Sequence, residues 1–175
     1  MPTIGVSIAV PDPAGEWLQD FRVDLGDETA RLIPTHITLV PPTEVGADAL
    51  AAITDHLEAA AASQEPFEVR LHGTGTFRPT SPVVFIGVIA GIAGCMELAA
   101  ATRSGPLGVD VEFPYHPHVT VAHHLAEEAL DRAFTELAGY ETTFDVTEFW
   151  LYVHNEDHGW RPTRSFSLGA GPAVI

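Results

Sequence analysis

Apolar residues along the chain occur in short runs that end at proline, glycine or polar turns, and these runs alternate with stretches of helical spacing. Residues 4–10 form the first run, which stops at Pro11-Asp12-Pro13 and therefore predicts a buried strand. The same pattern predicts further strands at residues 36–40 (ending at Pro41-Pro42), 67–77, 82–90, 118–122, 144–154 and 160–169.

Four other stretches carry strong helix formers with apolar residues three or four positions apart. They predict helices over residues 14–25, 47–62, 92–103 and 126–139. In these helices the expected inward side chains include Trp17, Leu18, Met96, Leu98 and Phe134.

Two of the predicted strands contain the same four-residue word, which is His, an apolar residue, Thr, then another apolar residue. The first copy begins at His36 and the second at His118. Since side chains alternate along a strand, His36 projects with Thr38, and His118 with Thr120, while the apolar residues between them point to the core. Each strand thus presents one imidazole and one hydroxyl on the same side.

The order of elements after each copy is also the same: motif strand, helix, strand, turn, strand. This repetition indicates an internal duplication within one domain that spans residues 1–175. We expect an α+β fold of two pseudo-symmetric lobes, each an antiparallel sheet with flanking helices, around a central cleft that carries one motif per lobe.

Such a cleft contains the groups that acid–base cleavage of a phosphodiester requires. A neutral imidazole removes a proton from the attacking hydroxyl, and a protonated one donates to the departing oxygen. The two Thr hydroxyls can donate hydrogen bonds to non-bridging phosphate oxygens. A single His-x-Thr is a weak signal, but two copies followed by the same element order are a strong one, and this chemistry needs no metal or other cofactor.

The composition limits which classes of ligand and which cellular location are expected. The chain carries 24 acidic residues against 8 basic ones, all of them arginine, with a net charge of −16, so long nucleic acid is not expected as a ligand. The single Cys95 has no partner for an internal disulfide, no run of apolar residues is long enough to span a membrane, and the first residues lack the basic region of a secretory signal. We therefore expect a cytoplasmic monomer.

The sequence resembles the two-histidine phosphoesterases, which include the 2′-5′ RNA ligases and cyclic nucleotide phosphodiesterases. The resemblance rests on the two His-x-Thr words, on "LHGTGTFRPTSPVVFIGV" at residues 71–88, and on "YHPHVTVA" at residues 115–122. It implies that His36 and His118 perform acid–base catalysis and that Thr38 and Thr120 bind the phosphate. The implied substrates are nucleotides or short RNA ends with a 2′,3′-cyclic or 2′-5′ phosphodiester, in RNA processing.

The chain departs from that family's pattern at two places. Ala122, His123 and His124 stand where RNA-acting members often have an arginine after the second motif, and Val83 replaces a frequent arginine between the motifs. These departures argue against a long RNA substrate and leave two alternatives open. One is a phosphodiesterase for a small metabolite, such as a cyclic ADP-ribose phosphate, and the other is a non-catalytic nucleotide-binding module.

Other residues are weaker candidates for the site. Arg78 ends a strand that borders the expected cleft and is a candidate phosphate ligand, and Tyr115 is a candidate stacking surface for a base. The histidines between residues 116 and 124 suggest zinc, but no acidic or cysteine ligand lies at a recognised spacing, so no metal site is expected. The repeated word alone does not tell which His is the base and which is the acid, nor whether hydrolysis or ligation is favoured.

Overall fold

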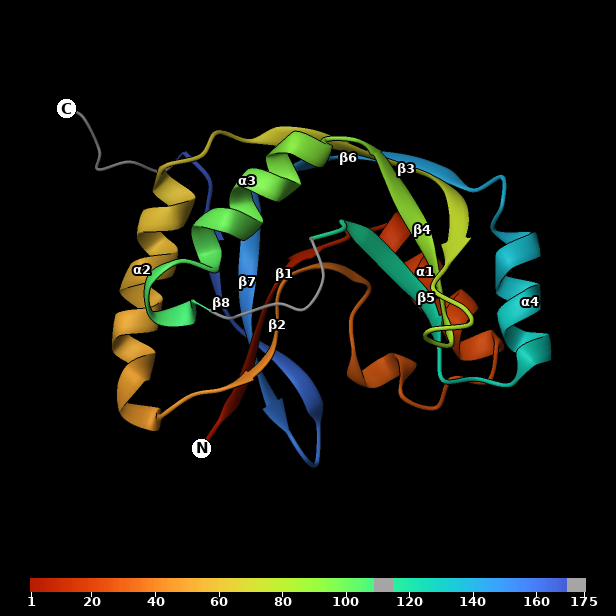
Figure 1. The fold of residues 1–175 in the computed structure, drawn as a ribbon, viewed down its shortest axis with the longest axis horizontal. Helices are drawn as coiled ribbons and strands as arrows, with labels where there is room; N and C mark the ends of the chain where they lie inside the picture. The colour runs from red at the N-terminus through yellow and green to blue at the C-terminus, as the bar shows by residue number, and fades with distance from the viewer. Residues whose placement is uncertain (109–114, 170–175) are drawn as a thin grey trace.

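The computed structural model describes residues 1–108 and 115–169 and has the predicted α+β architecture, built on one curled antiparallel sheet (Figure 1). The eight strands lie in the order β6-β3-β4-β5-β2-β1-β7-β8. Their bounds are β1 Thr3–Ala9, β2 His36–Glu44, β3 Phe67–Thr76, β4 Val83–Ala90, β5 His118–His123, β6 Glu141–Val146, β7 Glu148–Asn155 and β8 Gly159–Ser167.

The helices cover the two halves of the sheet separately. Their bounds are α1 Ala14–Asp24, α2 Leu50–Ala62, α3 Ile92–Thr102 and α4 Glu127–Glu136, with short 3₁₀ turns η1 Ala30–Leu32, η2 Ala47–Ala49 and η3 Gly105–Leu107. Helices α2 and α3 pack on each other and against β8 and β2, whereas α4 packs on β3, β4 and β5, and α1 contacts β5. Figure 1 shows α2 and α3 at one end of the molecule and α4 at the other.

The two motif strands meet at the centre of the sheet, and the half-sheets are joined there by a single bridged pair, Ile37 with Val119. Strands β3 and β4 follow the first motif along the chain, but they add to β5, the second motif strand. Strands β7 and β8 follow the second motif and add to β1, beside β2. The predicted lobes are therefore confirmed as half-sheets, each built from segments of both sequence halves, and the internal duplication stays a prediction.

The strand predicted over residues 144–154 is in fact two strands, β6 and β7, separated at Thr147. Strand β6 pairs with β3 at one edge of the sheet, and β7 pairs with β1 in the other half. One residue can connect these strands only because the sheet curls and brings its two ends together. The break has a sequence signal: the buried positions are Val146 and then Phe149, so the two-residue alternation changes phase there.

The first motif strand was predicted to end at Pro41-Pro42, but β2 continues through both prolines to Glu44. Val40 pairs with Val6 and Thr43 pairs with Ile4, so the two prolines stand opposite one residue, Gly5. This irregularity is a β-bulge, which removes the need for proline N–H groups in the ladder.

The core fills the space between the curled sheet and the helices, and most of the predicted inward residues belong to it. Three predicted core side chains are instead substantially exposed, namely Trp17, Met96 and Phe134. Trp17 stacks on Tyr140 with the ring centroids 4.9 Å apart, so it packs on a neighbouring surface residue rather than in the core. No helix in the described part of the chain is long and apolar enough to cross a membrane.

The Ile37–Val119 pair predicts a specific stability effect. Ile37 is fully buried at the junction of the half-sheets, so Ile37→Ala should lower the free energy of unfolding by ~2–5 kcal/mol, measured by urea denaturation. Ile89→Ala on β4 is the matched control because Ile89 is 48% exposed, and it should cost less than about 1 kcal/mol. Similar losses in the two variants would contradict the importance of this junction.

Candidate functional site

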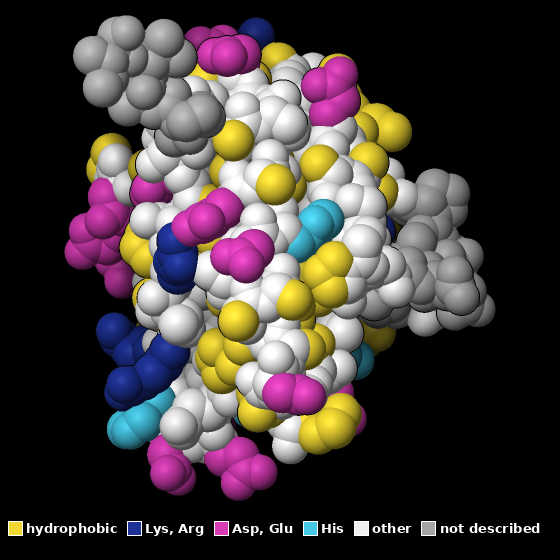
Figure 2. Space-filling view, turned by 90° about the vertical axis from the view of Figure 1, so that its left-hand side faces the viewer, with side chains coloured by type: hydrophobic (Ala, Val, Ile, Leu, Met, Phe, Trp, Pro, Cys, Tyr) yellow, Lys and Arg dark blue, Asp and Glu magenta, His cyan; other side chains and the backbone are white. Residues whose placement is uncertain are grey.

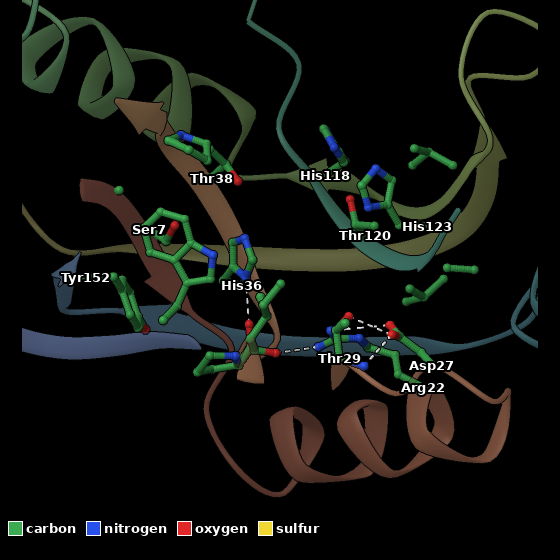
Figure 3. Close-up of a pocket in the computed structure, with 18 of the residues that line it drawn as sticks. Ser7, Arg22, Asp27, Thr29, His36, Thr38, His118, Thr120, His123 and Tyr152 are labelled. Atoms are coloured by element: carbon green, nitrogen blue, oxygen red, sulfur yellow. Dashed lines mark hydrogen bonds and ion pairs between the residues drawn. The ribbon is translucent and has the colours of Figure 1, made fainter. Parts of the chain in front are cut away.

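A cavity of about 290 Å³ lies where the two motif strands meet, and both motifs line it (Figure 3). Alternation along β2 and β5 sends His36, Thr38, His118 and Thr120 toward this cavity. The alternate residues Ile37, Leu39, Val119 and Val121 are buried in the core. The sequence expectation that each strand presents an imidazole and a hydroxyl to a shared space matches this arrangement.

Both imidazoles are held in the same way. Nδ1 of His36 lies 2.6 Å from the Pro34 carbonyl oxygen, and Nδ1 of His118 lies 2.6 Å from the His116 carbonyl oxygen. A carbonyl only accepts hydrogen bonds, so each Nδ1 must carry the proton that it donates. In its neutral form each ring therefore has its lone pair on Nε2, the nitrogen that a base uses.

The surroundings favour the neutral form of both rings. Burial lowers the pKa of His36 below its ordinary value; the hydrogen bond to Pro34 opposes this, and the charges of Arg22 and His118 lower the pKa further. Burial also lowers the pKa of His118, against the hydrogen bond to His116, and the charge of His116 adds to the lowering. The two rings thus share a tether but differ in the charges that act on them.

A buried ion pair on the α1 side of the cavity was not predicted. Arg22 is 6% exposed, and its Nη2 lies 3.9 Å from Oδ2 of Asp27. The Oδ1 atom of Asp27 accepts hydrogen bonds from the backbone N–H and the hydroxyl of Thr29. A signal existed: Arg22 follows the buried Leu18 by four residues and precedes the buried Leu25 by three, which places it on the inward face of the helix.

Three lining residues come from strands that the motif analysis did not single out: Ser7 of β1, Tyr152 of β7 and Trp160 of β8. His123, at the end of the second motif strand, lines the cavity as well. In Figure 3, Ser7 and Tyr152 lie on one side of His36, and Arg22, Asp27 and Thr29 lie on the other. The cavity therefore has the aromatic ring of Tyr152 on one side and the ion pair of Arg22 and Asp27 on the other.

The two weaker candidates do not line the cavity. Arg78 donates hydrogen bonds from Nη1 to Glu127 and Asp131, 3.1 and 2.8 Å away, so its charge is matched by carboxylates of α4. The Tyr115 hydroxyl donates to the backbone oxygen of Thr38 at 2.8 Å, which ties the lead-in of β5 to β2. Within residues 1–108 and 115–169, no three His, Cys, Asp or Glu side chains gather as a metal-binding group.

Comparison with known proteins identifies the family of this chain. The profile of the 2′-5′ RNA ligase superfamily matches residues 10–158, and the chain belongs to that superfamily, whose members are two-histidine phosphoesterases. A Bacillus licheniformis protein named "Putative phosphoesterase" is 28% identical over 148 residues, which cover 82% of this chain and 86% of the relative. A Geobacillus kaustophilus protein of the same name is 24% identical over 172 residues, 97% of this chain and 98% of its own.

Solved structures show the same fold. Escherichia coli LigT without ligand superimposes with a TM-score of 0.71 at 23% identity, covering 96% of this chain and 98% of LigT. TT0787 of Thermus thermophilus gives a TM-score of 0.69 at 21% identity, covering 97% of this chain and 98% of its own. Together, the superfamily membership and the fold support a phosphoesterase function.

The two carbonyl tethers predict the protonation site of each neutral ring. At a pH above the imidazole pKa, long-range ¹H–¹⁵N correlation spectra should show His36 and His118 protonated on Nδ1, the less common tautomer of free histidine. His72, whose side chain is exposed on β3, serves as a reference within the same protein. Protonation of either motif ring on Nε2 would contradict the tethered geometry.

Proposed function

We propose that the protein is a metal-independent phosphoesterase that hydrolyses, or reversibly forms, 2′,3′-cyclic or 2′-5′ phosphodiester bonds of nucleotides or short RNA ends. The observation that carries the proposal is the pair of imidazoles, each fixed through Nδ1 and each lining one cavity together with a Thr. In this scheme Nε2 of one ring accepts a proton from the attacking water, and Nε2–H of the other donates to the departing ribose oxygen.

The hydroxyls of Thr38 and Thr120 complete this scheme. They lie two residues after each His on the same face of the strand, so both line the cavity beside the rings. There they can donate hydrogen bonds to the non-bridging oxygens, whose negative charge grows in the transition state. The rings supply acid and base, and the threonines stabilise the charge, so the residues of this chain provide for each part of the reaction.

Small nucleotides suit the cavity better than long RNA does. A cavity of about 290 Å³ is at the lower end of the range for small-molecule sites, ~300–1,000 Å³. On the face in Figure 2, acidic side chains are spread over the surface, which repels a polyanion. Structures of E. coli LigT have been solved with 3′-AMP, ATP, NADP⁺ and phosphate, which supports nucleotides as the ligand class here.

A phosphodiesterase for a small metabolite, such as a cyclic ADP-ribose phosphate, is the second candidate. The observation that favours it is that Val83 and His123, which stand where RNA-acting members of the family often carry an arginine, both line the cavity. Turnover of a panel of 2′,3′-cyclic mononucleotides, 2′-5′ dinucleotides and cyclic ADP-ribose phosphates separates the two. Ligand binding without turnover of any member would indicate a binding module instead.

The acid–base scheme predicts the effect of removing each group. His36→Ala and His118→Ala should each lower kcat by ~10²–10⁴-fold, and Thr38→Val and Thr120→Val by ~10–100-fold, because each valine removes one hydrogen bond to a charged group. The rates are measured with EDTA present, and His72→Ala, on the exposed face of β3, is the matched control. Activity abolished by EDTA but retained in the His variants would refute the proposed chemistry.

The direction of the pKa shifts predicts the pH profile. The reaction needs one neutral and one protonated ring, so kcat/KM should be bell-shaped, and because both pKa values are lowered its alkaline limb should lie below the ordinary imidazole pKa of about 6.5. A bound phosphodiester anion favours the protonated rings, so the limbs of the kcat profile should lie at higher pH. An alkaline limb of kcat/KM well above 6.5 would contradict the lowered values.

A further inference from the structure

Arg22 carries its positive charge in a buried position, where an unpaired charge would destabilise the folded protein. It projects from α1 into the wall of the cavity with 6% of its surface exposed. Its Nη1 donates to the backbone oxygen of Ile33 at 2.8 Å and contacts Oγ1 of Thr35 at 3.4 Å. Burying a guanidinium is unfavourable unless its N–H groups have hydrogen-bond acceptors. These contacts therefore offset the cost of burying Arg22.

The partners of Arg22 flank the residue that orients His36. Ile33 and Thr35 stand on either side of Pro34, whose carbonyl accepts the hydrogen bond from Nδ1 of His36. The backbone of Thr35 is also held from β1, because the Val10 N–H donates to its oxygen at 3.1 Å. Arg22 thus fixes both sides of the peptide that sets the direction of the His36 ring.

The charge of Arg22 also distinguishes the two motif histidines. Arg22 comes from α1, and its charge acts on His36, whereas its partner Asp27, from the following loop, acts on His123 of β5. His118 of β5 and Tyr152 of β7 are the other titratable groups that line the cavity. His118 has different neighbours, namely His116, whose Nδ1 is 3.4 Å away, and the rings of Phe77 and Phe85 at centroid distances of 5.2 Å. A fixed cation therefore acts on His36, whereas a titratable ring and two apolar rings surround His118.

We propose that Arg22 is a positioning residue that fixes the peptide beneath His36 and biases His36 to act as the general base of hydrolysis, which leaves His118 as the general acid. The assignment rests on the proposed phosphoesterase function. Burial favours the neutral form of both rings, and Arg22 adds its positive charge on the His36 side alone, so His36 is the ring better suited to begin the reaction neutral. The imidazole charge that the acid must carry is then on His118, away from the guanidinium.

Hydrolysis with His36 as the base and His118 as the acid moves two protons. Nε2 of His36 takes one proton from water as the water oxygen forms a bond to phosphorus. The bond from phosphorus to the ribose oxygen breaks, and its electron pair stays on that oxygen. Nε2–H of His118 protonates this oxygen, so each turnover consumes one water and leaves the two rings with exchanged protonation states, which solvent restores.

NMR titration of the ring resonances tests the electrostatic part without any substrate. The double variant Arg22→Met/Asp27→Asn removes the ion pair as a unit, so it leaves no uncompensated carboxylate, and the asparagine can still accept from Thr29. We expect the pKa of His36 to rise, because the charge of Arg22 acts on this ring and that of Asp27 does not, and the pKa of His118 to change by less than a third as much.

The matched control is Arg70→Met/Glu141→Gln, which removes an exposed ion pair between β3 and β6 and should leave both ring pKa values unchanged. An unchanged His36 pKa in the test variant, or an equal rise for both histidines, would overturn the proposal. Circular dichroism and the dispersion of the amide resonances confirm that each double variant is folded.

Arg22→Lys separates position from charge. Lysine keeps the cation but lacks the planar fork with which Arg22 holds the Ile33 carbonyl through Nη1 while Nη2 faces Asp27, so we expect a low His36 pKa together with a kcat lowered by ~10–100-fold. A kcat equal to that of the parent would overturn the positioning role. Absence of turnover by the parent itself would refute the proposed function and the base assignment with it, while the NMR titration would still decide whether Arg22 controls the charge of His36.

Discussion

The structure depends on one constraint, which is that β2 and β5 must bury alternate residues at the junction of two half-sheets. Ile37 and Val119 form the single bridged pair between these strands, and both are fully buried. Since alternation is strict, burying them forces His36 and His118 to the opposite face, where the strands diverge and the cavity opens. The contact that holds the half-sheets together is therefore also what brings the two imidazoles to one cavity.

The two halves are alike in backbone geometry and unlike in electrostatics. Each motif ring donates from Nδ1 to the carbonyl two residues before it, so the same local contact orients both rings. On the His36 side, α1 contributes the buried Arg22, whose Nη1 holds the Ile33 carbonyl. Chemically equivalent motifs can thus take different roles in a reaction that needs one acid and one base, without any change in the motif itself.

Much of the fold and the centre of the site could be predicted because their signals are local. The four helices follow from residue spacing, and the His-x-Thr words fix which side chains share a face. The pairing of distant strands was not predicted. Strands β3 and β4 join the second motif strand rather than the first. The change of phase between Val146 and Phe149 separates two strands, β6 and β7, that belong to different half-sheets. Arg22 was not predicted because arginine is usually exposed in folded proteins, although its position on the helix is that of a core residue.

The charges of the protein are arranged differently at the surface and in the cavity. The surface carries most of the net charge of −16, and Arg78, Arg132 and Arg164 are paired with carboxylates. Around the motifs, the formally charged lining residues are Arg22 and Asp27, which oppose each other, and the histidines favour their neutral forms. A monoanionic phosphodiester would therefore meet a nearly neutral cavity inside a strongly acidic protein. Its recognition then depends on directed hydrogen bonds from the rings and hydroxyls rather than on a field of positive charge, which suits a small ligand that enters the cavity and not a long polyanion that must lie across the surface.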